Sequence, residues 1–184
     1  KWHGKAAEQG DSNSQYELGK LYSRGKHVLQ DFDEAKNLYL KAAMQGHKEA
    51  QFEIGNMYSL GNGVSRDLNK ARKWFLKSVE NGSSSPQLQL GLMNYYGVGI
   101  PENMEKAFYW FDLVKKWNAR AQIYLTQMYA TGLGVKKDKI EGLKWLREAA
   151  GQGQDAENGS PWAQLYLGQW YINRDPLGLG SKFD

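Results

Sequence analysis

The stretch AQFEIGNMYSLGNGVSRDLNKARKWFLKSVENG, Ala50 to Gly82, decides the fold, because most other segments of the chain repeat its spacing. In its first half Ile54 and Tyr58 lie four residues apart, the spacing of one helix face. Gly61 follows, at a position where a residue in the left-handed conformation ends a helix. Asp67 then stands where the N-cap of a second helix belongs. The stretch therefore predicts two helices joined by a glycine turn.

Copies of this pattern extend in both directions. A glutamine marks the same position in each copy, at Gln15, Gln51, Gln87, Gln122 and Gln164, with spacings of 36, 36, 35 and 42 residues. A period in this range is typical of helical-hairpin solenoids. The long last interval comes from a polar insertion at residues 152–160, which we expect to form an extended loop. The predicted fold is all-α, an α–α superhelix built as a right-handed solenoid of helix–turn–helix repeats.

The expected organisation is a single elongated repeat domain over residues 1–184. It comprises a half repeat at 1–10, full repeats at 14–46, 50–82, 86–118 and 121–153, and the first helix and turn of a further repeat at 161–184. Both ends of the sequence fall in mid-repeat, and an open repeat end exposes apolar surface. We therefore expect flanking helices outside this sequence, or self-association through the open ends.

Glycines recur inside the predicted first helices, at Gly19, Gly55, Gly91 and Gly168. Glycine in a helix interior costs about 1 kcal/mol relative to alanine. A cost repeated in this way indicates that the partner helix crosses too closely for a Cβ atom. Thr126 occupies this position in the fourth repeat, so we expect a wider crossing there.

Composition excludes several classes of function. The formal net charge is +4, but the 24 Lys and Arg and the 20 Asp and Glu are interleaved, so there is no basic stripe for nucleic acid. The chain has no cysteine, which excludes disulfides, thiolate zinc sites and a cysteine nucleophile and leaves the cellular compartment open. No apolar run approaches the roughly 18 residues of a spanning helix.

The sequence also lacks a catalytic or metal-binding constellation. His3, His27 and His47 fall at unrelated repeat positions, and none belongs to a metal-binding motif. His27 takes the place of a turn glycine, which histidine tolerates because it is enriched at positive φ. We therefore expect no cofactor and no enzyme activity.

The pattern AxxxLGxxYxxGxGVxxDxxKAxxWxxKAAxxG resembles the Sel1-like repeat, a relative of the tetratricopeptide repeat. The residues that carry the match are Ala50, Ile54, Gly55, Tyr58, Gly61, Gly63, Val64, Asp67, Lys70, Ala71, Trp74, Lys77 and Gly82. The resemblance covers essentially the whole chain. It implies an α-solenoid that scaffolds protein complexes, in settings such as signalling, host–microbe interaction and quality control in the endoplasmic reticulum. The paired cysteines of some members are missing, so packing between repeats must supply the stability.

In such solenoids the first helices line the concave face, and the residues between core positions point into it. The candidate partner-binding residues are Tyr16, Lys20, Arg24, Asn56, Leu60, Leu92, Tyr95, Tyr96, Gln127 and Gln169. The face is expected to be basic near Lys20 and Arg24, aromatic in the middle, and amide-rich near its end. Our hypothesis is that Leu92, Tyr95 and Tyr96 form the central contact. The alternative is that these side chains pack against the next helix.

The expected function is a non-catalytic interaction scaffold or adaptor that binds a protein or peptide. A glycan- or cell-wall-binding module is an alternative, suggested by seven Trp and eleven Tyr. However, Trp74, Trp110 and Trp145 share one repeat position, which favours a place in the core. A toxin-neutralising immunity binder, as found among bacterial family members, is a special case of the scaffold.

Overall fold

The computed structural model describes residues 2–151, 161, 163–165 and 167–168, and these residues form helices and turns without a strand. They confirm the all-α prediction. The chain separates into two compact units, Lys1–Leu90 and Gly91–Asp184. The expected single elongated domain stays a prediction.

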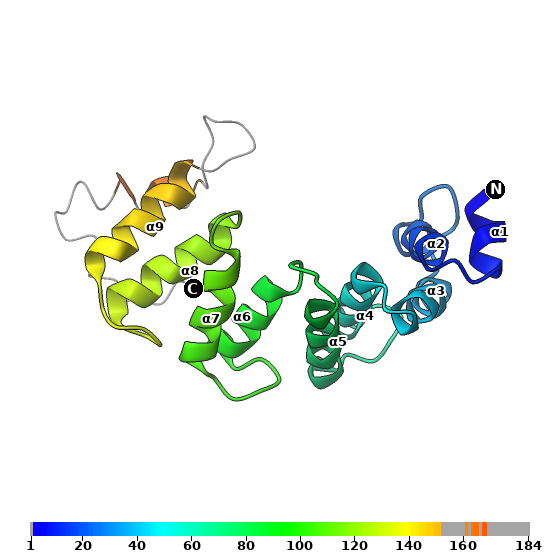
Figure 1. Ribbon diagram of the computed structural model, residues 1–184, viewed down its shortest axis with the longest axis horizontal. Coiled ribbons are helices and arrows are strands. Elements are labelled where there is room, and N and C mark those ends of the chain that lie inside the picture. Colours follow the sequence, from blue (N-terminus) through cyan, green and yellow to red (C-terminus); the bar gives the residue numbers. More distant parts are fainter. Residues whose placement is uncertain (1, 152–160, 162, 166, 169–184) are drawn as a thin grey trace. The chain divides into compact units, whose positions relative to one another are not determined.

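The first unit is a series of helices that pack on their neighbours in sequence. They are α1 (Trp2–Glu8), α2 (Ser12–Arg24), α3 (Phe32–Met44), α4 (Lys48–Leu60) and α5 (Leu68–Glu80). Figure 1 shows α2 beside α3 and α4 beside α5, and α3 also contacts α4. The apolar core between α3 and α4 consists of Ala35, Tyr39, Ala42, Ala43, Ala50, Ile54 and Met57. The packing thus buries one stripe of each helix against the next, as the spacing predicts.

The second unit continues the same arrangement. Its helices are the larger part of α6 (Gln87–Tyr96), then α7 (Met104–Val114), α8 (Ala119–Thr131) and α9 (Lys139–Gly151), followed by helical residues at 161, 163–165 and 167–168. Helix α8 packs on both α7 and α9. In the part of the chain that the structure describes, no helix combines the length and apolar character needed to cross a membrane.

The N-cap predicted at Asp67 recurs at the equivalent position of the other repeats. A side-chain oxygen at the N-cap accepts a hydrogen bond from the backbone N–H three residues later, at 2.9, 2.9, 2.8 and 3.0 Å for Asp31, Asp67, Asn103 and Asp138. These bonds satisfy donors that a helix start leaves free. His27 has a φ of 66°, which confirms that it adopts the left-handed conformation of a turn glycine.

Aromatic rings explain three of the four predicted mid-helix glycines, Gly19, Gly55 and Gly91, whereas nothing lies within 4 Å of a Cβ atom built on Gly168. A Cβ atom built on Gly55 would lie 2.5 Å from the Phe75 ring of α5, and one on Gly91 would lie 2.5 Å from Phe111 of α7. The fourth repeat does not simply widen at Thr126. Its glycine has moved to the partner helix, because a Cβ atom on Gly142 would lie 3.0 Å from the Thr126 carbonyl oxygen. The fourth repeat therefore keeps a close contact between its two helices, with the glycine on the second helix instead of the first.

At three of its positions, the repeated glutamine joins a repeat to the one before it. The side-chain Nε2 of Gln15 donates to the Ala7 carbonyl oxygen at 3.1 Å, and Gln51 donates to Ala43 at 3.0 Å. In the second unit Gln122 donates to Lys115 at 2.6 Å. All three glutamines are buried. Because a buried amide needs a partner, this hydrogen bond fixes the position of each first helix on the preceding second helix.

Candidate functional site

The principal candidate surface is a cluster of three tyrosines, Tyr95, Tyr96 and Tyr124, which we call the tyrosine cluster. The hydroxyl oxygens of Tyr96 on α6 and Tyr124 on α8 lie 3.0 Å apart and share a hydrogen bond. The Tyr95 ring meets both other rings edge-on, with centroids 5.0 Å from Tyr96 and 5.1 Å from Tyr124. Tyr96 is 50% exposed, so this rigid group presents an aromatic ring to solvent.

The cluster is positioned by the packing rule that explains the glycines. Phe111 is fully buried because its ring occupies the space left by Gly91. The Tyr124 ring stacks on Phe111, at 4.8 Å between centroids and 10° between planes. Aromatic contacts of this kind add to the free energy gained from burial. The exposed tyrosines therefore rest on the core of the unit.

Burial controls the protonation of the cluster. Burial, followed by the hydrogen bond and charge interaction with Tyr124, raises the pKa of Tyr96 to about 12, while Arg120 opposes this shift. The pKa of Tyr95 is also raised, mainly by burial. At neutral pH both hydroxyls are therefore protonated. They can donate and accept hydrogen bonds but carry no charge.

Replacing Tyr124 by phenylalanine tests this geometry. The variant loses the hydroxyl partner but keeps the ring that covers Tyr96, so the pKa of Tyr96 should fall from about 12 while staying above its ordinary value of 10.0. The ¹³Cζ chemical shift of tyrosine, followed against pH, measures it. Tyr22→Phe in the first unit is the control and should leave the Tyr96 curve unchanged. An unaltered midpoint in Tyr124→Phe would contradict the hydroxyl pair.

The corresponding face of the first unit is less basic than expected. The Lys20 ammonium group lies 5.1 Å above the Tyr16 ring and pairs with Glu17 at 2.9 Å. Burial raises the pKa of Tyr16, and the charges of Glu53, Glu17 and Glu49 raise it further. Carboxylates from α2 and α4 therefore partly balance the charge of Lys20, which makes this part of the face less basic than the sequence predicts.

His47 completes this part of the surface. Its ring stacks on Tyr16 with centroids 4.6 Å apart, and its Nδ1 accepts a hydrogen bond from the Ala50 N–H at 3.3 Å. Its Nε2 lies 3.1 Å from Asn13 Oδ1. The histidine thus serves as the N-cap of α4, which gives it a structural role.

The other candidate residues differ in their availability. Arg24 and Leu60 are exposed, while Leu92, Gln127 and Asn56 are half-buried. The amide of Asn56 donates to Glu53 at 3.2 Å. Gln169 lies outside the described residues.

Tyr95 corrects the predicted central contact. It is only 9% exposed, so its side chain supports Tyr96 from beneath instead of facing a partner. For Tyr95 the alternative prediction, packing against neighbouring helices, agrees with the structure. The rings of Phe111 on α7 and Tyr124 on α8 both contact the Tyr95 ring.

Sequence reasoning missed Tyr124. Its repeat position holds Glu17, Glu53 and Gln89 in the three preceding copies. An aromatic residue at a position that is polar in these three copies is a signal that could have found it, and Tyr166 holds the same position in the last copy of the sequence. The repeated tryptophans Trp74 and Trp145 are half-buried instead of fully in the core, and Lys77 and Lys144 cover their rings at 4.7 and 5.3 Å.

Capped helical hairpins, held together by glycine–aromatic crossings and glutamine hydrogen bonds, define a helical repeat scaffold. The Sel1 repeat model matches residues 1–11, 12–47, 48–83, 87–113 and 119–154. The chain belongs to the Sel1 repeat family. Repeats of this family usually mediate protein interactions.

Solved structures support the same assignment. A Sel1 repeat protein from Oxalobacter formigenes is 32% identical over 91% of this chain and 47% of its own, with a TM-score of 0.79. A protective antigen present in uropathogenic Escherichia coli strains, with an SLR fold, is 33% identical over all of this chain and 37% of its own, with a TM-score of 0.85. This chain thus spans less than half the length of either protein. No curated protein matches its sequence.

A third solved structure shows the fold alone. It is a Sel1 repeat protein from Klebsiella pneumoniae, 21% identical over 93% of this chain and 80% of its own, with a TM-score of 0.58. Together these similarities establish a repeat scaffold of the solenoid class.

Proposed function

We propose that this chain is a non-catalytic scaffold or adaptor that binds a protein or peptide through the exposed face of its first helices. The tyrosine cluster carries the proposal. A half-exposed tyrosine that is fixed by a hydrogen bond and by ring contacts loses little conformational entropy on binding, and tyrosines are enriched among residues that dominate interface energetics.

The surroundings of the cluster fit the same role. Gln127, one turn after Tyr124 on α8, is half-buried and adds an amide that can pair with a peptide backbone. Arg120, one turn before Tyr124, is exposed and supplies a positive charge close enough to influence Tyr96. A rigid aromatic centre with a polar rim is the usual arrangement of a protein interface.

A photocrosslinking experiment tests the proposal. p-Benzoylphenylalanine replaces Tyr96 in one variant and the exposed Lys73 of α5 in a control, and each protein is irradiated with extract from cells of the source organism. A polypeptide should be captured from position 96 and not from position 73. Tyr96→Ala with Tyr124→Ala should weaken binding of that polypeptide by about tenfold or more.

Two results would count against the proposal. The first is capture of the same polypeptides from both positions. The second is equal binding by the wild type and by the double alanine variant, once thermal unfolding has shown that both are folded. Retention of polysaccharide in place of protein would instead favour a glycan-binding module.

A further inference from the structure

The outward face of α7 carries an apolar stripe that the first-helix surface does not include. Tyr109, Leu113 and Trp117 are 56%, 39% and 65% exposed and follow one another at intervals of four residues. This spacing places Tyr109 and Leu113 on one side of the helix, and Trp117 lies in the turn that follows Val114. The buried residues Ala107 and Phe111 lie on the opposite side. Helix α7 is therefore apolar on both faces.

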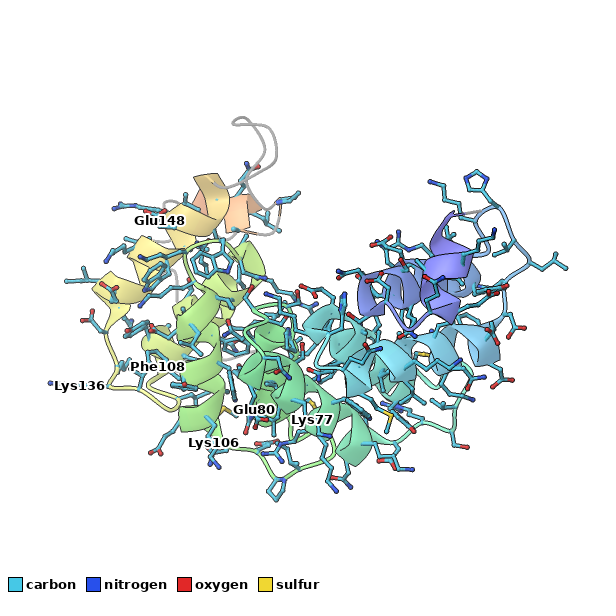
Figure 2. The ribbon with its side chains drawn as sticks, turned by 45° about the vertical axis from the view of Figure 1, so that its right-hand side comes forward. Lys77, Glu80, Lys106, Phe108, Lys136 and Glu148 are labelled. Atoms are coloured by element: carbon cyan, nitrogen blue, oxygen red, sulfur yellow. The ribbon has the colours of Figure 1, made fainter. Side chains whose placement is uncertain are left out.

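The other repeats show that the fold does not require apolar residues here. The positions equivalent to Tyr109, Leu113 and Trp117, counted from the N-cap of each second helix, are polar and exposed in the other described repeats. They are Asn37, Lys41 and Gln45 in the first repeat, Lys73, Lys77 and Asn81 in the second, and Lys144 and Glu148 in the fourth. Figure 2 labels Lys77 and Glu148, two of these positions. The third repeat alone, among the described copies, has replaced polar side chains with Tyr, Leu and Trp.

One of the replacements removes a structural contact. Gln45 donates to the buried Gln15 at 2.8 Å, and Asn81 donates to Gln51 at 3.0 Å. Trp117 occupies the equivalent position without a side-chain amide. The substitution thus gives up a hydrogen bond type used in two other repeats and exposes a large ring. Exposed aromatic and aliphatic side chains that form a contiguous patch are typical of interaction sites.

Charge and size indicate what covers the stripe. The exposed Lys106 and Lys116 flank it together with Glu105, and Asp112 and Lys115 form an ion pair at 2.6 Å, so positive charges around the stripe outnumber negative ones. The surroundings therefore favour a partner with negative charge. The stripe extends over nine residues, about 12 Å along the axis. Its three side chains, at no more than about 150–250 Å² each, offer less than the roughly 800 Å² that each subunit of a stable dimer buries. They match two to three turns of one partner helix.

We propose that Tyr109, Leu113 and Trp117 form a second docking surface, which accepts an amphipathic helix with acidic margins from a partner protein. A ridge of side chains four residues apart packs between the ridges of another helix. The edge contact of Tyr109 with Trp110, at 5.1 Å between centroids, holds the first anchor of the surface in place. This site does not depend on the tyrosine cluster.

The test uses the chain's own second repeat as the template for the variant. Tyr109→Lys, Leu113→Lys and Trp117→Asn together install the residues of Lys73, Lys77 and Asn81, so the variant should remain folded. The probe is a designed helical peptide of about four turns, with leucines on one face and glutamates at its margins. A second peptide carries lysine in place of each glutamate. Fluorescence anisotropy of the dye-labelled peptide measures its affinity for each protein. In the wild type, the indole N–H signal of Trp117 in NMR spectra, assigned with Trp117→Phe, shows where the peptide binds.

The wild type should bind the acidic peptide at least about tenfold more tightly than the triple variant does. The wild type should also prefer the acidic peptide to the lysine peptide by at least about tenfold. Tyr96→Ala should bind the acidic peptide as the wild type does, which separates this surface from the proposed function. Equal binding by the wild type and the triple variant would overturn the proposal. Equal affinity of the wild type for both peptides would overturn it too. The same holds if the wild type forms a dimer that the triple variant does not form, or if anionic lipid vesicles shift the Trp117 signal and the peptide does not.

Discussion

Replacing Phe111 by alanine is expected to lower the free energy of unfolding by about 3–5 kcal/mol, the range for a fully buried aromatic side chain. The ring fills the space above Gly91 and stacks on Tyr124, so its loss leaves a cavity under the tyrosine cluster. The variant should therefore lose stability and the fixed geometry of the binding surface together. Urea unfolding measures the first effect, and broadened or shifted tyrosine ring signals in NMR measure the second.

Leu113→Ala is the matched control, because Leu113 lies on the same helix but on its exposed face. Its effect on stability should stay within about 0.5 kcal/mol, as for most surface substitutions. Similar losses in the two variants would show that the packing of α7 differs from that described.

Replacing Gly55 by threonine is expected to cost about 2–3 kcal/mol, because a Cβ atom would lie 2.5 Å from the Phe75 ring. The fourth repeat indicates how the chain can accommodate threonine. There Thr126 is accompanied by Gly142 and Leu146 at the positions of Ala71 and Phe75. Adding Ala71→Gly and Phe75→Leu to the variant should recover at least about 1 kcal/mol of the loss, which denaturant unfolding would measure.

Gly151→Ala provides the reference for this series. Nothing lies within 4 Å of a Cβ atom at Gly151, so alanine should leave stability unchanged or raise it slightly. If Gly55→Thr combined with Ala71→Gly and Phe75→Leu is no more stable than Gly55→Thr alone, the inference that glycine on the second helix compensates for threonine on the first is refuted.

The sequence predicted the helices because each boundary has a local chemical cause. An N-cap such as Asp67 bonds to a backbone group three residues away, and the stripe of Ile54 and Tyr58 is visible within one helix. The reason for Gly55 was also predictable, since a helix interior rarely accepts repeated glycine without close packing. What the sequence left open was the identity of the group that excludes the Cβ atom.

The candidate site was harder to predict because it depends on contacts between helices. Tyr95 and Tyr96 are adjacent in sequence, yet Tyr124 and Phe111 cover the first and leave the second half-exposed. Likewise, the charges that act on Tyr16 of α2 include those of Glu53 and Glu49, which lie on α4. Comparison of equivalent repeat positions was the more informative guide, since it distinguishes Tyr124 and Trp117 from the residues that the repeat requires.

The glutamine hydrogen bonds between repeats have a consequence for how such a chain can change over evolutionary time. In each case the acceptor is a main-chain carbonyl, so the residue that provides it can be alanine, as at Ala43, or lysine, as at Lys115. Each of these repeats therefore supplies the side chain that forms the hydrogen bond, and the bond does not require a particular side chain in the preceding repeat. A duplicated or exchanged repeat can join the array without matching substitutions at this contact. The exposed positions are then free to diverge toward new partners.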